Sequence, residues 1–161
     1  MSAATDVPNI AEALAPILQR VPIEHQPLLV AVAERMAAER YRGWSAAVSE
    51  PRSKAGLLAC AAREEEIARR VEALYPNAAA IQQGILAQIP ELADVNRSLF
   101  APYSLNQQLR LQAQGERLGA ATWRSVARHH SNAAAREVFL ACATLEEESA
   151  AFLESIFNDT P

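Results

Sequence analysis

Aromatic residues, glycine and cysteine are all scarce in this 161-residue sequence. Aromatic side chains make up 6% of the chain and there are five glycines, whereas alanine, leucine, glutamate and arginine are abundant. Residues that favour β-strands are therefore few, and residues that favour helices dominate. The composition predicts an all-α protein that folds as a single domain over residues 1–161.

The sequence also has no excess of basic residues and no long apolar run. Its formal net charge is −4, so no overall positive field attracts nucleic acid or an anionic membrane surface. No segment approaches the ~18 consecutive apolar residues of a membrane-spanning helix. The first ten residues, MSAATDVPNI, lack the basic and apolar regions of a signal peptide. We expect no nucleic-acid or membrane partner and a cytoplasmic location.

Only two cysteines are present, Cys60 and Cys142, and both lie in alanine-rich helical text. In a reducing compartment a free cysteine behaves as a small apolar side chain, so we expect both in the core. A redox pair or a pair of soft metal ligands is the alternative that the sequence leaves open.

The period of the apolar residues predicts one short and four long helices. The short helix covers about 8–20, and three of the long helices cover about 23–48, 105–130 and 133–157. The remaining long helix begins within the stop and start signals of residues 49–53 and runs to about 74. Residues 1–7 and 158–161 are expected to be irregular ends. Between the second and third long helices, the proline-rich residues 76–103 predict a crossover connection with one short helix at its start. Tight turns within each pair and this long crossover predict an antiparallel four-helix bundle.

An internal repeat relates the two helix pairs. Residues 57–74 and 139–156 share nine identities at an offset of 82, including a cysteine and four glutamates. At the same offset, 16 of the 46 positions 29–74 are identical, without a gap. We interpret the halves, about 23–74 and 105–157, as duplicated helical hairpins. Tyr41 and Trp123 also match, and we expect both in the core rather than in electron transfer.

The repeat places one matched glutamate on each long helix: Glu34, Glu64, Glu116 and Glu146. Glu64 lies one turn after Cys60 on the apolar strip of its helix, and Glu146 follows Cys142 in the same way. If the hairpins are related by a pseudo-twofold axis, these carboxylates meet in the centre of the bundle. One carboxylate per helix is the number that a dinuclear metal site needs.

This pattern resembles the ferritin-like superfamily, and within it the rubrerythrin-like proteins. That family places a glutamate on each of two helices and a Glu-x-x-His motif on each of the other two, around two iron or manganese ions. The resemblance covers about residues 23–157 and implies that Glu34, Glu64, Glu116 and Glu146 are the carboxylate ligands.

The histidines of the family motif are missing. Ile67 and Ser149 occupy the positions three residues after Glu64 and Glu146. The three histidines of the chain lie near predicted helix ends, at His25, His129 and His130. Loss of both imidazoles removes two metal ligands, so affinity for iron is expected to fall.

Two arrangements can accommodate four glutamates without histidine. Either a hard divalent cation remains bound, or the site is degenerate and metal-free. In the second case the glutamates face outward, or Arg35, Arg63 and Arg117 neutralise them together with shared protons.

The sequence favours a non-catalytic ferritin-like protein without a cofactor that acts by binding a partner or by forming a homodimer. The short N-terminal helix and the apolar residues of 76–103 are the surfaces expected to meet a partner. The alternative is a di-iron or di-manganese protein, an oxidase, a peroxidase or a metal store, that uses the four glutamates. The sequence does not decide whether the protein is an enzyme.

Overall fold

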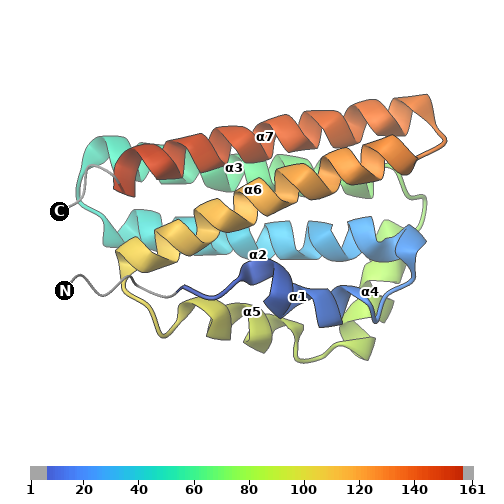
Figure 1. Ribbon diagram of the computed structural model, residues 1–161, viewed down its shortest axis with the longest axis horizontal. Helices are drawn as coiled ribbons and strands as arrows, with labels where there is room; N and C mark the ends of the chain where they lie inside the picture. Colours follow the sequence, from blue (N-terminus) through green and yellow to red (C-terminus); the bar gives the residue numbers. More distant parts are fainter. Residues whose placement is uncertain (1–6, 158–161) are drawn as a thin grey trace.

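The computed structural model describes residues 7–157, and the expected ends at 1–6 and 158–161 lie outside this range. The described residues form seven α-helices and no strand, so the all-α prediction is confirmed (Figure 1). None of the helices in this range combines the length and apolarity that a membrane span requires.

Four of the helices are long. They are α2 (Gln26–Ala47), α3 (Pro51–Glu72), α6 (Leu105–His129) and α7 (Ala133–Phe157). The shorter helices are α1 (Ile10–Leu18), α4 (Ala78–Gln88) and α5 (Leu92–Phe100), and a 3-10 turn, η1 (Ile23–His25), precedes α2.

Local sequence signals set the helix ends. The predicted capping box forms at α6, where the Ser104 hydroxyl accepts from the backbone N–H of Gln107 and the Gln107 side chain accepts from that of Ser104. Pro27 lies in the first turn of α2, where its missing N–H costs no hydrogen bond. The Glu50 carboxylate caps α3, and this helix begins at Pro51, within the residues 49–53 where its start was predicted.

Helix α5 was not predicted, because the prolines around it suggested an irregular connection. Pro90 and Pro102 instead lie outside the helix and bound it. Leu92, Asn96 and Phe100, four residues apart, form its buried face. A nine-residue helix shows this period for barely two turns, too short a run to be recognised in the sequence.

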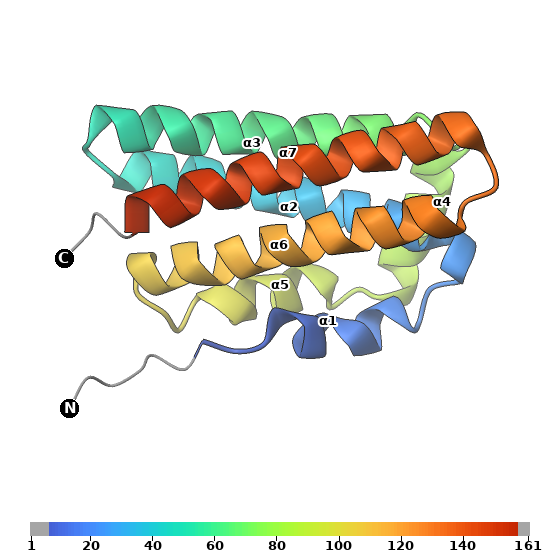
Figure 2. The same ribbon diagram turned by 45° about the horizontal axis from the view of Figure 1, so that its top comes forward.

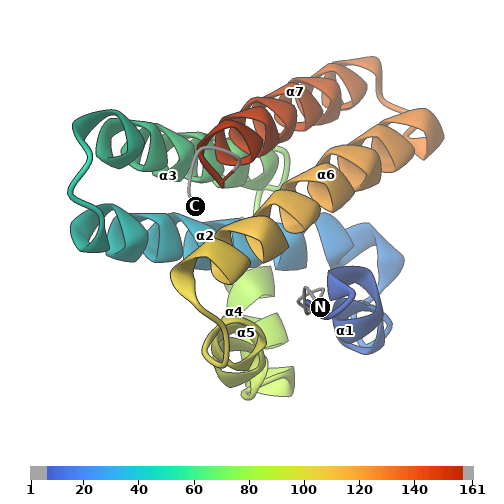
Figure 3. The ribbon, with the colours of Figure 1, turned by 60° about the vertical axis from the view of Figure 1, so that its left-hand side comes forward.

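The long helices are arranged as two antiparallel hairpins, α2 with α3 and α6 with α7, and α3 packs against α7 (Figures 1 and 2). The shorter helices lie on the side of α2 and α6 that faces away from α3 and α7 (Figure 3). Helix α1 contacts α6, whereas α4 and α5 contact α2 (Figure 3).

The crossover and α1 were predicted to offer apolar surface to a partner, and this prediction is wrong for Ile85, Ile89 and Leu92 of the crossover. Ile85, Ile89 and Leu92 of the crossover are buried together with Ile17 of α1 against Leu28 of α2. The chain covers these side chains with its own second helix, so they are not free to bind another protein.

Ion pairs on the surface repeat at the 82-residue offset. Arg35 of α2 pairs with Glu72 of α3 at 2.6 Å, and Arg117 of α6 pairs with Glu154 of α7 at 2.8 Å, each through two hydrogen bonds. A second matched set is formed by Arg42 with Glu65 and Arg124 with Glu147. Matched residues therefore occupy equivalent places in the two hairpins.

Two apolar clusters in the core contain the matched cysteines and the matched aromatic residues Tyr41 and Trp123. Tyr41 and Cys60 belong to one cluster, and Trp123 and Cys142 belong to the other. Both cysteines are buried and free, as expected for small core residues. Because they lie in different clusters, the arrangement gives no support to a redox pair.

Candidate metal centre

The four matched glutamates are all buried between the long helices. Their exposed fractions are 8% for Glu34, 0% for Glu64, 1% for Glu116 and 2% for Glu146. Outward-facing glutamates are thereby excluded. Each comes from a different helix, α2, α3, α6 and α7, so only the tertiary packing of both hairpins brings the carboxylates together.

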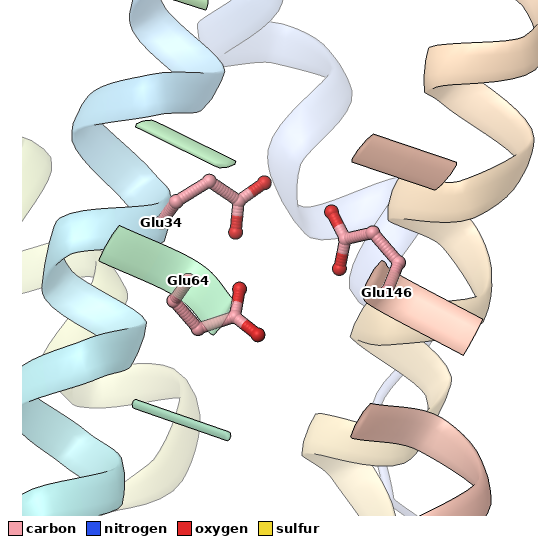
Figure 4. Close-up of side chains that lie close together, drawn as sticks. All are labelled: Glu34, Glu64 and Glu146. Atoms are coloured by element: carbon pink, nitrogen blue, oxygen red, sulfur yellow. The ribbon is translucent and has the colours of Figure 1, made fainter. Parts of the chain in front are cut away.

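Three of the four carboxylates form a compact cluster. One oxygen each from Glu34, Glu64 and Glu146 lies within 4.8 Å of the others. Figure 4 shows the three side chains directed toward a common space, Glu34 and Glu64 from one hairpin and Glu146 from the other. A cation with metal–oxygen bonds of about 2.1–2.6 Å holds oxygens up to about 4–5 Å apart. The spacing is therefore that of ligands to a single ion.

Glu116 is held differently from the other three. Its Oε1 accepts hydrogen bonds from the Tyr41 hydroxyl at 2.6 Å and from Nε2 of Gln112 at 2.7 Å. Its Oε2 is buried without a hydrogen-bond partner among the described residues. Position 30, the repeat equivalent of Gln112, is a valine, so Glu34 lacks the corresponding amide donor.

Glu64 and Glu146 each accept one hydrogen bond from a neighbouring helix. Trp123 Nε1 donates to Glu146 Oε1 at 2.9 Å, and the Ser149 hydroxyl donates to Glu64 Oε1 at 3.3 Å. The Ser149 oxygen in turn accepts from Nε of Arg63 at 3.0 Å. Glu64 Oε2 is buried and has no partner in the described part of the chain. Ser149, at the position where the resemblance predicts a histidine, therefore hydrogen-bonds to a glutamate.

Burial shifts the acid–base equilibria of the cluster. Desolvation raises the pKa of Glu34 from 4.5 to about 7, with the nearby Glu116 adding to the rise. Burial and the surrounding carboxylates also raise the pKa of Glu64 and of Glu146 well above the usual value. Without a cation, the cluster therefore retains protons at neutral pH.

The arginines expected to neutralise the cluster do not contact it. Arg35 and Arg117 form surface ion pairs with Glu72 and Glu154, and Arg63 binds Ser149 and the Cys60 sulfur. That prediction is wrong for Arg35 and Arg117, because α2 and α6 turn their side chains toward ion pairs on the surface. Arg63, on α3, reaches Glu64 only through the Ser149 hydroxyl.

Arg40 is the cation that the sequence analysis missed. It donates to the side-chain oxygens of Gln112 and Asn96, and its guanidinium stacks 4.1 Å from the Phe100 ring centre. Burial lowers the pKa of Arg40 to about 10. An arginine in an amphipathic helix usually reaches solvent, so the sequence offered no signal for it.

Two other residues that support the cluster, Gln112 and Gly119, lie close to Glu116 in the sequence, which is a weak indication of their role. Gln112 precedes Glu116 by four residues and so shares its helix face, a spacing that could have identified it. Gly119 lies three residues after Glu116, and a Cβ atom there would approach Glu146 Oε1 to 2.4 Å. The glycine thus provides the space that this carboxylate occupies.

The donor set fits a hard divalent cation. All the clustered donors are carboxylate oxygens, which suit Mn²⁺, Mg²⁺ and Ca²⁺ and are less selective for iron than sites containing imidazole. Two buried carboxylate oxygens also lack partners, and a buried charge of this kind is stable only when protonated or paired.

Comparisons of the chain with protein-family models, with curated proteins and with solved structures found no match.

Proposed function

We propose that this chain is a ferritin-like four-helix bundle protein that binds a divalent cation through Glu34, Glu64 and Glu146. The observation that carries the proposal is the meeting of three buried carboxylates, one from each of three helices, with oxygens within 4.8 Å of one another. The ferritin-like assignment is supported by the one glutamate per long helix and by the crossover between the two hairpins.

Electrostatics favour a bound cation at neutral pH. The carboxylates of the cluster are desolvated and mutually repulsive, and each stays neutral only by holding a proton. A divalent ion replaces these protons and compensates the charge, so binding releases protons and strengthens as the pH rises. The all-oxygen donor set makes Mn²⁺ the appropriate first probe, with Fe²⁺, Mg²⁺ and Ca²⁺ as competitors.

The test is metal content after chelation and reloading. We expect purified protein, stripped with EDTA and incubated with Mn²⁺, to retain about one ion per chain by elemental analysis. Saturation at 100 times the dissociation constant stabilises the fold by about 2.7 kcal/mol, which a thermal melt detects.

Matched variants separate the cluster from the acidic surface. Glu64→Gln removes a ligand charge at constant volume and is expected to abolish retention of Mn²⁺. Glu148→Gln, on the exposed face of α7, is expected to retain it. If the wild-type protein binds no ion under these conditions, or if both variants behave alike, the metal-binding proposal fails and a proton-bearing, metal-free cluster takes its place.

Self-association remains a second proposal, supported by exposed leucines. Leu58 of α3 and Leu140 of α7 are 46% and 49% exposed and occupy matched positions of the repeat. Covering these exposed apolar side chains with a second chain removes them from water, which is favourable. A homodimer predicts a mass that falls to the monomer value on dilution in sedimentation experiments, and Leu58→Gln with Leu140→Gln should yield a monomer at all concentrations. A wild-type monomer throughout contradicts the proposal.

A further inference from the structure

A second feature of the interior is a cavity of about 210 Å³ between α1, α2, α5 and α6. Most of its wall is apolar, including Ile10, Leu14, Leu29, Leu92 and Leu118. Helix α1 contacts α6 and contributes Ile10 and Leu14 to the wall. The cavity is thus built from elements outside the two hairpins as well as from the hairpins themselves.

Polar side chains also line the cavity, among them Arg40, Gln112 and Glu116. The Gln112 amide accepts from Arg40 at 2.8 Å through its oxygen and donates to Glu116 at 2.7 Å through its nitrogen. A single amide group therefore joins a half-buried guanidinium group and a buried carboxylate.

Arg40 and Glu116 can each form a further hydrogen bond. Arg40 carries five N–H bonds, and its three hydrogen bonds go to Gln112 and Asn96. Glu116 is 1% exposed, and its Oε2 has no partner among the described residues. The lining of the cavity thus includes N–H donors of Arg40 and a Glu116 oxygen that accepts no hydrogen bond.

We propose that this cavity binds a small, neutral, mostly apolar alcohol or phenol. Its hydroxyl group donates to Glu116 Oε2 and accepts from Arg40, and its hydrocarbon part fills the apolar chamber. A hydroxyl is both a donor and an acceptor, so one group satisfies both walls. A carboxylate has no donor for Glu116 Oε2. An ammonium group has no acceptor for Arg40 and lies beside its positive charge.

The volume limits the size of the ligand. A cavity of about 150 Å³ holds benzene, so one of about 210 Å³ accommodates about eight non-hydrogen atoms. p-Cresol and p-xylene have this size and differ only in replacement of a hydroxyl by a methyl group. Benzoate and benzylammonium supply the anionic and cationic counterparts.

The experiment is calorimetric titration of the full chain with each of the four compounds, in EDTA and again after incubation with Mn²⁺. We expect p-cresol to bind at least about tenfold more tightly than p-xylene, since hydrogen bonds to charged groups exceed neutral ones in strength. Benzoate and benzylammonium are expected to bind more weakly than p-cresol.

Substitutions in the cavity wall and nuclear Overhauser contacts show where p-cresol binds. Ala33→Leu, which adds bulk to the cavity wall on α2, is expected to weaken p-cresol binding at least tenfold. Ala62→Leu, on the exposed face of α3, should leave it unchanged. Should Ala33→Leu fail to fold, nuclear Overhauser contacts in the wild-type protein serve instead: p-cresol should contact methyl groups of Leu14 and Leu118 and not those of Leu58.

Several results overturn the inference. They are absence of p-cresol binding up to millimolar concentration, equal affinity for p-xylene, tighter binding of either charged compound, or contacts outside the cavity. The inference does not require the proposed metal, because Glu116 is not among the three clustered ligands. Binding of p-cresol to protein that takes up no Mn²⁺ therefore refutes the proposed function alone, and the converse result refutes the ligand alone.

Discussion

The raised pKa of Glu34 makes a direct prediction about stability and pH in the metal-free protein. In the folded state the pKa of this carboxyl is about 7, against 4.5 when it is solvated. Between these values the unfolded chain loses the proton while the folded chain holds it. The free energy of unfolding therefore falls as the pH rises through this window and changes little beyond it. Glu34→Gln removes the titrating group and keeps the shape of the protonated side chain.

The magnitude follows from the size of the pKa change. A rise from 4.5 to about 7 corresponds to about 3 kcal/mol at 1.36 kcal/mol per pH unit. Below pH 4.5 the carboxyl is neutral in both states, and the variant and the wild type should differ least. By pH 8 the variant should gain about 3 kcal/mol relative to the wild type. Partial hydration of the cluster makes this an upper value.

Urea unfolding followed by circular dichroism, at pH values from 4 to 8 in the presence of EDTA, measures the difference. Glu148→Gln is the control, because its exposed carboxylate on α7 should give a difference that does not vary with pH. In saturating Mn²⁺ the sign at pH 8 should reverse, since Glu34→Gln then loses a ligand. A variant that tracks the wild type within about 0.5 kcal/mol across the whole pH range would falsify the account of Glu34 as a buried, proton-holding carboxyl.

Two further substitutions test the packing around the cluster. Gly119→Ala places a Cβ 2.4 Å from Glu146 Oε1. We expect this substitution to displace the carboxylate, weaken Mn²⁺ retention and lower the free energy of unfolding by about 1–3 kcal/mol. At Gly84, by contrast, a Cβ meets no atom within 4 Å, so Gly84→Ala should stabilise its helix by about 0.5–1 kcal/mol. Tyr41→Phe removes the 2.6 Å hydrogen bond to Glu116 and should lower the free energy of chemical unfolding by about 1–3 kcal/mol. Tyr103→Phe serves as the control. Equal effects of the two tyrosine variants, or full Mn²⁺ retention by Gly119→Ala, would contradict the geometry described for these residues.

Much of the local structure follows from the sequence alone. Helix propensity and apolar periodicity identify the four long helices and α1, because a helix of several turns repeats its buried face often enough to be recognised. Capping at Ser104 was predictable for a related reason, since the interaction lies within four residues. Helix α5 was missed because its buried face extends over barely two turns and prolines flank it.

The buried glutamates show where sequence reasoning was sufficient and where it was not. The 82-residue repeat identified Glu34, Glu64, Glu116 and Glu146 as equivalent, because duplication preserves residue types at fixed spacing. It did not establish whether they face inward, since acidic helix faces are usually solvated.

Only the tertiary structure decided which carboxylates cluster and which groups support them. Glu116 lies outside the group of three clustered carboxylates and accepts hydrogen bonds from Tyr41 and Gln112. Arg40 is half-buried, and it contacts Asn96 and Phe100 of α5. The contacts of Glu116 with Tyr41 and of Arg40 with Asn96 and Phe100 join residues more than 50 positions apart in the chain. Their formation depends on how the hairpins and the crossover pack, and no local pattern of residues encodes that packing.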